Sequence, residues 1–291
     1  MQRNLIVKLR LIINRTQMMS QLRTPDQIKQ TVKEKYAAIS NQSNGDSCCG
    51  PANCCPPDGN VDYSIFSDDY SKLEGYNPDA DLQLGCGLPT EFAKIKPGDT
   101  VVDLGSGAGN DAFVARQIVG ETGRVIGLDM TEAMIQRATL NAIKLNFMNV
   151  DFVLGDIEEM PLDDAIADVV VSNCVLNLVP DKKKAFSETF RILKSGGHFS
   201  ISDVVISGNL PGAIKEDAEM YAGCVAGAID KNEYLQIVKN AGFENITVQQ
   251  QKEIQLPDEM LLNYLSKEEL KEFQNSDTGI YSITVYAEKN C

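Results

Sequence analysis

The sequence contains a single histidine, His198, and no tryptophan. One imidazole excludes any metal site built from several histidines and disfavours acid–base catalysis by histidine. Basic residues are also in the minority, with 27 Lys and Arg against 41 Asp and Glu and a formal net charge of −14. Such a chain repels phosphate backbones and anionic lipids, so we expect neither a nucleic-acid partner nor a membrane partner.

Long apolar runs are missing as well. No segment approaches 18 uninterrupted apolar residues, so no transmembrane helix is predicted. Residues 1–23 carry basic but no acidic side chains, and Lys8 and Arg10 interrupt their apolar stretch. Because no small-residue cleavage site follows, the pattern argues against a signal peptide. We therefore expect 1–23 to be a disordered basic extension and the protein to be cytoplasmic.

Against these absences stand eight cysteines, which are grouped rather than scattered. In a reducing cytoplasm, clustered thiols indicate metal binding or catalysis rather than structural disulfides. Four of them lie in a stretch rich in Asn, Ser, Gly and Pro, which predicts a mobile loop: Cys48, Cys49, Cys54 and Cys55. With a helix predicted to begin at Thr24-Pro25, where Thr is the N-cap, this loop forms an N-terminal segment, 24–60.

The central region alternates strand-like apolar runs with helical patterns, which predicts a parallel α/β sheet. We assign this core to 61–205 and an acceptor-binding and C-terminal region to 206–291. The expected strands are 100–104, 124–128, 150–154, 167–172, 198–205, 243–250 and 281–287. The expected helices of the two regions are 110–119, 131–145, 181–193, 213–228 and 231–240.

A glycine-rich turn, Gly105-Ser106-Gly107-Ala108-Gly109, follows the first of these strands. Its glycines let backbone amides and a helix N-terminus approach a ligand closely. Asp129 ends the second strand 24 residues after Gly105, where an acid can hold ribose hydroxyls. Asn110 stands where the dinucleotide fingerprint requires a further glycine, so NAD is disfavoured.

These motifs resemble the class I S-adenosylmethionine methyltransferases. The resemblance implies an α/β fold: a Rossmann-like, mostly parallel seven-stranded sheet with a helical acceptor-binding insertion and a C-terminal extension. It also implies S-adenosyl-L-methionine as the cofactor, with an acid and an adenine-backing residue at Asp129-Met130 and an adenine-edge segment at Gly155-Asp156-Ile157. The cofactor-binding residues implied in this way are Asp103, Gly105, Ser106, Gly107, Gly109, Asp129, Met130, Asp156, Ile157 and Asn173. A Rossmann-like domain with a vestigial pocket is the alternative.

Three further cysteines stand where a methyl acceptor is expected. Cys174 follows the fourth strand, whose carboxyl end faces the ligand crevice of an open α/β sheet. Cys86 lies between two glycines, and Cys224 lies in a run of small residues. Each alone is equally typical of a buried structural cysteine. The ordered motifs Gly85-Cys86-Gly87, Asn173-Cys174 and Tyr221-Ala222-Gly223-Cys224 together resemble the arsenite methyltransferases.

This resemblance implies that thiolates of Cys86, Cys174 and Cys224 bind trivalent arsenic, which the cofactor then methylates. It further implies a disulfide between Cys86 and Cys54 or Cys55, which returns the arsenic to the trivalent state, and a thioredoxin-like or glutathione-type reductant. An arsenic acceptor presents a lone pair and needs no deprotonating base, in agreement with the shortage of histidine.

Two other functions remain open at this point. The chain is alternatively a C- or O-methyltransferase of a small organic molecule, or a non-catalytic thiol-based protein that binds a metalloid or zinc. Cys48-Cys49 and Cys54-Cys55 have a spacing that also suits zinc. Leu84 departs from the family, since some members carry an aromatic residue there, and Cys291 is expected to be an exposed bystander.

Overall fold

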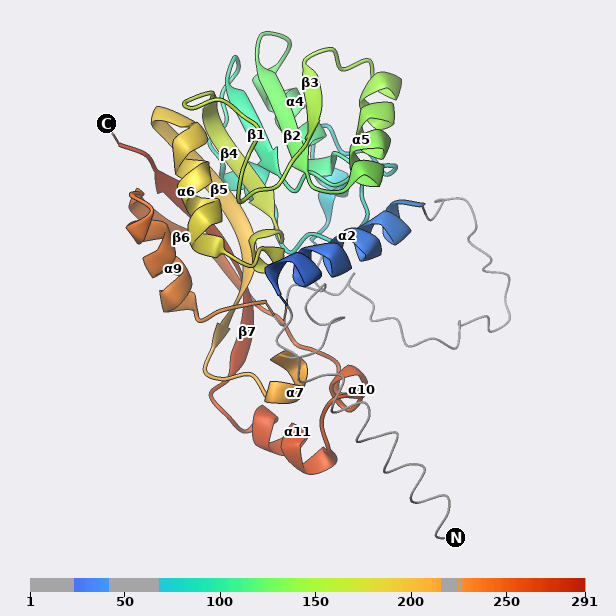
Figure 1. Cartoon of the computed structure of the whole chain (residues 1–291), viewed down its shortest axis with the longest axis vertical. Helices are drawn as coiled ribbons and strands as arrows, with labels where there is room; N and C mark the ends of the chain where they lie inside the picture. Colours follow the sequence, from blue (N-terminus) through green and yellow to red (C-terminus); the bar gives the residue numbers. More distant parts are fainter. Residues whose placement is uncertain (1–23, 42–67, 216–224, 226, 291) are drawn as a thin grey trace.

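The structure is a computed structural model that describes residues 24–41, 68–215, 225 and 227–290 (Figure 1). Its strands are β1 (Thr100–Leu104), β2 (Arg124–Asp129), β3 (Val150–Leu154), β4 (Ala167–Asn173), β5 (Leu193–Ser207), β6 (Glu244–Glu253) and β7 (Gly279–Glu288). Its helices are α2 (Pro25–Asn41), α3 (Pro89–Phe92), α4 (Asn110–Val119), α5 (Glu132–Lys144), α6 (Lys182–Ile192), α7 (Gly212–Lys215), α9 (Lys231–Asn240), α10 (Asp258–Leu261) and α11 (Lys267–Gln274), with short 3-10 turns η2 (Tyr70–Lys72) and η3 (Leu176–Leu178).

The seven strands form one sheet in the order β3-β2-β1-β4-β5-β7-β6. The first five are parallel to one another, and β7 runs antiparallel to both of its neighbours. The order reverses at β1, which lies between β2 and β4. In open α/β sheets such a switch point is where ligands bind, at the carboxyl ends of the strands.

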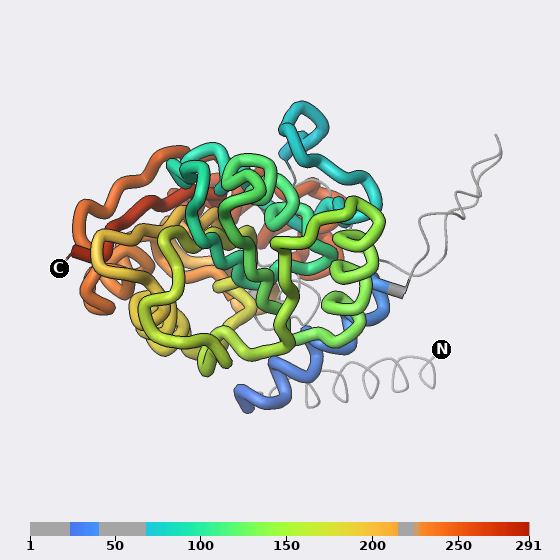
Figure 2. The backbone as a smooth tube through the Cα atoms, turned by 90° about the horizontal axis from the view of Figure 1, so that it is seen from above, coloured from blue at the N-terminus to red at the C-terminus, as the bar shows by residue number. Residues whose placement is uncertain are grey.

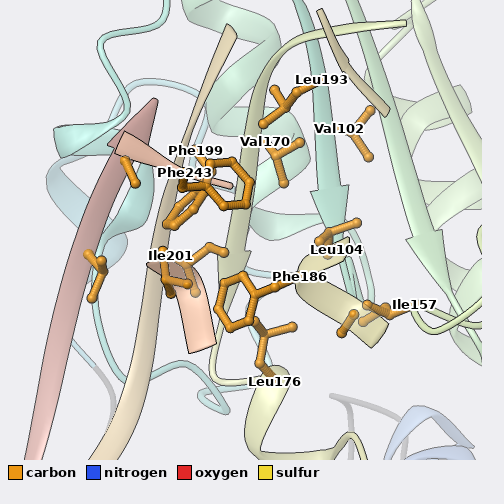
Figure 3. Packing of buried hydrophobic residues seen from close by; sticks show 14 of the residues in the cluster. Val102, Leu104, Ile157, Val170, Leu176, Phe186, Leu193, Phe199, Ile201 and Phe243 are labelled. Atoms are coloured by element: carbon orange, nitrogen blue, oxygen red, sulfur yellow. The ribbon is translucent and has the colours of Figure 1, made fainter. Parts of the chain in front are cut away.

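The two faces of the sheet are buried against different helices because successive side chains of a strand alternate between faces. In β1, Val101 packs in a cluster with α4 residues such as Phe113. Its neighbour Val102 instead packs in a cluster that includes Phe186 of α6 and Tyr234 of α9. Figure 3 shows this second cluster, in which the Phe199 and Phe243 rings meet edge to face with their centroids 4.7 Å apart. The strands therefore form the middle layer of a three-layer core.

Helix α2 begins where the sequence predicts. The Thr24 hydroxyl accepts the Gln27 N–H at 3.3 Å, and the Gln27 side chain accepts the Thr24 N–H at 2.9 Å, a reciprocal cap. The helix lies along the outside of the molecule beside α5 (Figure 2). The Arg137 guanidinium of α5 donates to the Ser40 carbonyl at 3.1 Å and fixes the carboxyl end of α2 there.

Two expected elements differ from the structure. β5 begins at Leu193 rather than at residue 198, because Leu193 pairs with Ala167 of β4 and the Gly196 N–H donates to the Lys289 carbonyl at 2.8 Å. The helix expected over 213–228 does not reach its predicted end. α7 occupies Gly212–Lys215, and the Ala228 N–H closes a turn on the Val225 carbonyl at 3.1 Å.

Helix α10, helix α11 and α7 lie together beyond one end of the sheet (Figure 1). They belong to the 206–291 region, for which the sequence predicts helical cover. None of the helices that the structure describes is long and apolar enough to span a bilayer.

Candidate functional site

A pocket of about 1090 Å³, counting its open mouth, lies at the carboxyl ends of β1, β2 and β4. Nine of the ten predicted cofactor residues line it: Asp103, Gly105, Ser106, Gly107, Asp129, Met130, Asp156, Ile157 and Asn173. The tenth, Gly109, is the N-cap of α4 with a φ of +100°. A Cβ at Gly109 would lie 2.7 Å from the Phe113 ring of the same helix and 3.0 Å from the Phe152 ring of β3, so a larger residue would not fit between these rings.

The glycine-rich turn is shaped by backbone conformations that favour glycine. Gly105 has a φ of +69°, and a Cβ there would lie 2.4 Å from a methyl group of Val175. Gly107 has a φ of +51° with no atom within 4 Å of its missing Cβ, so its backbone faces open space. The turn therefore leaves room for a ligand beside its amides, as the motif predicts.

Asp129 is buried at the end of β2 and is already engaged by backbone groups. Its carboxylate accepts the Gly107 N–H at 3.0 Å and the Thr131 N–H at 2.8 Å. Burial raises the pKa of Asp129, and these N–H bonds oppose the shift. The Asp129 carboxylate thus links the glycine-rich turn to the start of α5, in a residue that lines the pocket.

Three buried polar atoms of the pocket wall have no hydrogen-bond partner within the part of the chain that the structure describes. They are the oxygens Asp103 Oδ2, Ser106 Oγ and Asn110 Oδ1. A buried polar atom left in this way costs about 1–3 kcal/mol, so the fold maintains it only where something else satisfies it. A ligand that brings ammonium and hydroxyl donors fits this wall, and S-adenosylmethionine carries both.

Asp103 and Asp111 place two carboxyl groups beside each other in the same wall. Burial, and then the neighbouring Asp111, raise the pKa of Asp103 well above its usual range. Burial raises the pKa of Asp111 to about 6, although hydrogen bonds from Tyr70 and Asn173 oppose the shift. This part of the wall therefore holds two buried carboxyl groups whose charged forms are disfavoured by burial. A cationic ligand would stabilise those charged forms and is favoured here.

Tyr70, Asp111 and Asn173 form a hydrogen-bond cluster that sequence reasoning did not find. The Tyr70 hydroxyl donates a hydrogen bond to the Asp111 carboxylate at 2.9 Å. It accepts a hydrogen bond from the Asn173 amide nitrogen at 2.5 Å. Asn173 Oδ1 accepts the Cys86 N–H at 2.9 Å. Asp111 is the second residue of α4, directly after the glycine-rich turn, but no local sequence pattern indicates a role for Tyr70.

Helix α2 also contributes to the pocket. Lys29, Val32 and Tyr36 line it, and their helical spacing shows in the sequence as an apolar stripe with a lysine at its edge. The Lys29 ammonium lies 2.6 Å from Asp156 and 2.7 Å from Glu158. Burial lowers the pKa of Lys29, but its bonds to both carboxylates outweigh this and raise it overall. The predicted adenine-edge acid therefore has a structural counter-ion.

Cys174 lines the pocket directly after β4, and its backbone is unusual. Its φ is +60°, a conformation that non-glycine residues seldom adopt. The Cys174 N–H donates to the Ser202 carbonyl of β5 at 2.8 Å, which holds the residue in this turn. Such strain persists only where surrounding contacts enforce it, and it turns the thiol of Cys174 away from the regular strand direction.

Cys86 follows Gly85, which lines the pocket, and is itself buried in the same apolar cluster as Cys174. That cluster, which we call the thiol cluster, consists of Val32, Cys86, Cys174, Leu178, Val204, Ile206, Leu210, Ile214, Val225, Ala228, Ile254, Leu256, Leu261, Leu265, Leu270 and Ile280. It draws on α2, β5, α7, α10, α11 and β7. Both thiols are thus embedded in apolar surroundings that exclude water.

The glycines beside Cys86 are required by close packing. A Cβ at Gly85 would lie 2.6 Å from the Asn173 amide nitrogen. A Cβ at Gly87 would lie 2.5 Å from the Ser202 hydroxyl oxygen. The Ser282 hydroxyl also donates to the Cys86 carbonyl. The Gly-Cys-Gly motif is therefore wedged between β4, β5 and β7.

The other predicted thiols lie outside the described residues: Cys48, Cys49, Cys54, Cys55, Cys224 and Cys291. Within the described ranges, no three His, Cys, Asp or Glu side chains converge in a way that suits a metal ion. His198 has an internal partner, with its Nε2 atom 2.6 Å from the Ala93 carbonyl oxygen. The single imidazole thus stays within the sheet packing.

Residues 95–242 match a family model described as a methyltransferase domain. The arsenite methyltransferase of Halobacterium salinarum is 42% identical over 78% of this chain and 60% of its own length. The solved arsenic(III) S-adenosylmethionine methyltransferase of Chlamydomonas reinhardtii superposes with a TM-score of 0.61 at 35% identity, over 71% of this chain and 68% of the other. The chain belongs to the methyltransferase family and, within it, to the arsenite methyltransferases.

These matches confirm the predicted family, the predicted fold class and the cofactor of that family. The arsenite methyltransferase of Aquipseudomonas alcaligenes is 36% identical over 62% of this chain and 54% of its own length. The chain therefore spans about half to three fifths of the length of these two curated relatives.

Proposed function

We propose that this protein transfers methyl groups from S-adenosylmethionine to trivalent arsenic held by cysteine thiolates. The observation that carries the proposal is that Cys174 lines the same pocket as the glycine-rich turn. A thiol in that position presents its ligand to the methyl donor at the carboxyl ends of the strands. The relatives named above act on arsenite or arsenic(III), and their similarity supports the same substrate here.

The chemistry suits the residues available. The cofactor supplies a methyl group bonded to a positively charged sulfur. Arsenic(III) bound to thiolates keeps a lone pair, so the protein needs to position it but does not need to remove a proton. The thiol cluster supplies apolar walls around Cys86 and Cys174 that exclude competing water. His198 and the pocket acids are then not required as bases.

The complete ligand set follows from the family resemblance. Cys86, Cys174 and Cys224 are proposed to bind the arsenic, with Cys174 and Cys224 retaining it through the reaction. Methylation uses the arsenic lone pair and formally oxidises arsenic by two electrons. Oxidation of two thiols, that of Cys86 and that of Cys54 or Cys55, to a disulfide returns these two electrons to the arsenic, and a thioredoxin-like or glutathione-type thiol then reduces the disulfide.

The test is methylation of arsenite and of monomethylarsonous acid by single-cysteine variants, with arsenic speciation as the measurement. Cys174→Ser is expected to lower the rate with both substrates at least about 100-fold, because it removes a ligand that positions the acceptor. Cys86→Ser is expected to lose the rate with arsenite but to keep that with the monomethylated substrate. Cys291→Ser serves as the matched control and is expected to keep both.

Two outcomes would overturn the proposal. Full activity of Cys174→Ser on arsenite contradicts the ligand role of that thiol. Absence of methylated arsenic across a range of thiol reductants, with turnover of the cofactor on a small organic acceptor, points instead to a C- or O-methyltransferase in which the cysteines only pack.

A further inference from the structure

The three residues of the Tyr70–Asp111–Asn173 cluster line the pocket together with Gly85, whereas the next two residues of that loop, Cys86 and Gly87, do not line it. Tyr70 and Cys86 are both buried, with 4% and 0% of their surfaces exposed. The Tyr70 hydroxyl also lies 3.1 Å from the Gly87 carbonyl oxygen, so the cluster connects the pocket wall to the loop that carries the predicted arsenic ligand.

Asn173 holds this loop on both sides of the thiol residue. Its Oδ1 atom accepts the Cys86 N–H at 2.9 Å, and its Nδ2 atom donates to the Gly87 carbonyl at 2.8 Å. The same Nδ2 atom lies 2.5 Å from the Tyr70 hydroxyl and 3.3 Å from Asp111 Oδ2. One amide group is thus shared between the loop and the pocket wall.

The loop has little freedom to move independently of Asn173. The space that a Cβ of Gly85 would need is taken by the Asn173 amide, and that of Gly87 is taken by Ser202. Close-packed interiors transmit small displacements because no voids absorb them. A ligand that satisfies or repositions Asp111 therefore acts on Tyr70 and Asn173, and through Asn173 on the backbone of Cys86.

We propose that Tyr70 and Asp111 are positioning residues that couple occupancy of the cofactor pocket to closure of residues 85–87, so that Cys86 is held in place when the cofactor is bound. This inference rests on the proposed function, because it takes S-adenosylmethionine as the occupant of the pocket. Opening of these residues is favoured when the pocket is empty. By reciprocity, holding Cys86 in place strengthens cofactor binding by the same factor.

The experiment measures alkylation of Cys86 by iodoacetamide in the full chain, read by peptide mass spectrometry, with and without saturating S-adenosylhomocysteine. Because Cys86 is fully buried, alkylation reports local opening. In the unmodified protein, S-adenosylhomocysteine is expected to slow alkylation about 10-fold, within the usual range of coupling between sites. In Tyr70→Phe the protection is expected to fall below about 2-fold, while calorimetry still detects S-adenosylhomocysteine binding.

Asp111→Asn is the second variant and is expected to change the protection in the same direction, which keeps the test informative if Tyr70→Phe folds poorly. Tyr286→Phe is the matched control, because its hydroxyl bonds Glu288 at 2.7 Å outside the cluster. It is expected to retain the full protection.

The outcomes separate coupling from a purely structural role. If Tyr70→Phe accelerates alkylation equally with and without S-adenosylhomocysteine, the cluster only supports the loop and the coupling is wrong. If S-adenosylhomocysteine binds the unmodified protein but gives no protection, the coupling is again wrong while the proposed function stands. If S-adenosylhomocysteine does not bind at all, the cofactor assignment fails together with the coupling.

Discussion

The glycine-rich turn and the thiol cluster lie side by side but are built in opposite ways. The turn is polar and local in sequence, and it lies beside buried oxygens without a hydrogen-bond partner among the described residues, Asp103 Oδ2 near the end of β1 and Ser106 Oγ in the turn itself. The thiol cluster is apolar and gathers residues from Val32 to Ile280. Cys174 both lines the pocket and packs in the cluster, as do Val32 and Leu178.

The difference suggests how the two reactants are handled. A charged, polar donor is suited to a wall of backbone amides and carboxylates, which bind it reversibly. A soft acceptor is suited to thiols in a dry environment, where few groups compete for the ligand. The strained backbone of Cys174 lies at the boundary, where both reactants have to meet.

The largest loss of stability and of cofactor binding is expected from a substitution in the glycine-rich turn, Gly105→Ala. The new Cβ would lie 2.4 Å from Val175, and the φ of +69° is unfavourable for alanine. Overpacking and backbone strain together cost about 5 kcal/mol, and Val175 has little freedom to move because it is β-branched. Urea unfolding and calorimetric titration with S-adenosylhomocysteine are expected to show lost stability and lost binding.

Gly196→Ala is the control for the backbone conformation alone. Gly196 has a similar φ of +79°, but no atom lies within 4 Å of its missing Cβ. Its replacement is expected to cost about 1 kcal/mol and to leave cofactor binding unchanged. Equal losses in the two variants would show that the turn at Gly105 is not tightly packed against Val175.

The sequence predicts the polar side well because its signals are local. The seven strands, the glycine-rich turn and the acid at Asp129 follow from short-range periodicity and turn chemistry, and the structure has them at the expected positions. The predicted start of β5 is wrong because pairing with two distant residues, Ala167 and Lys289, extends the strand toward Leu193. A strand end set by a distant partner has no local signature.

The composition of the thiol cluster is much harder to predict from the sequence. The sequence alone offers glycine-flanked cysteines, and only a family resemblance suggests that they act together. The role of Tyr70 is not predicted from the sequence because its partner Asn173 lies 103 residues away. Val32 does appear in an apolar helical stripe, but periodicity does not reveal which cluster the stripe contacts. The roles of Cys54, Cys55 and Cys224 remain predictions.

Asp203 is a buried carboxyl group next to the thiol cluster, and the second prediction concerns the dependence of stability on its protonation. It follows Ser202, whose carbonyl holds Cys174, and it is 1% exposed. Burial raises the pKa of Asp203 to about 7, although Lys182, the Val204 N–H and the Tyr234 hydroxyl oppose the shift. The folded protein therefore binds a proton at Asp203 that the unfolded chain releases near pH 4.

This difference in proton binding determines how the free energy of unfolding changes with pH. Between about pH 4 and pH 7 the folded state binds more protons than the unfolded state, so this carboxyl lowers the free energy of unfolding as the pH rises. The shift corresponds to about 4 kcal/mol across that window. Asp203→Asn is expected to remove the Asp203 share of this decline when urea unfolding is measured against pH and compared with the unmodified protein, whereas Asp111 keeps its own share.

Tyr234→Phe sharpens the same test. Its hydroxyl donates to Asp203 at 3.3 Å and helps the charged form, so its loss is expected to raise the pKa of Asp203 and to extend the decline to higher pH. Parallel pH profiles for Asp203→Asn and the unmodified protein would mean that Asp203 is charged throughout, and that the thiol side is more polar than its burial indicates.

The smallest effect concerns α2, which contacts both regions through Lys29 at the pocket rim and Val32 in the thiol cluster. Lys29→Met removes two ion pairs and leaves Glu158 buried without its counter-ion, which is expected to cost about 1–2 kcal/mol. Hydrogen exchange of the α2 amides, measured beside urea unfolding, is expected to accelerate more than exchange elsewhere.

Lys144→Met is the matched control, because Lys144 pairs with Asp79 at 3.2 Å while both side chains are more than half exposed. Its loss is expected to cost less than about 0.5 kcal/mol and to leave α2 exchange unchanged. If Lys29→Met also leaves α2 exchange unchanged, the helix is held by Val32 and its apolar neighbours alone. The polar pocket would then depend on the thiol cluster for this wall, and the two regions would be less independent than their construction suggests.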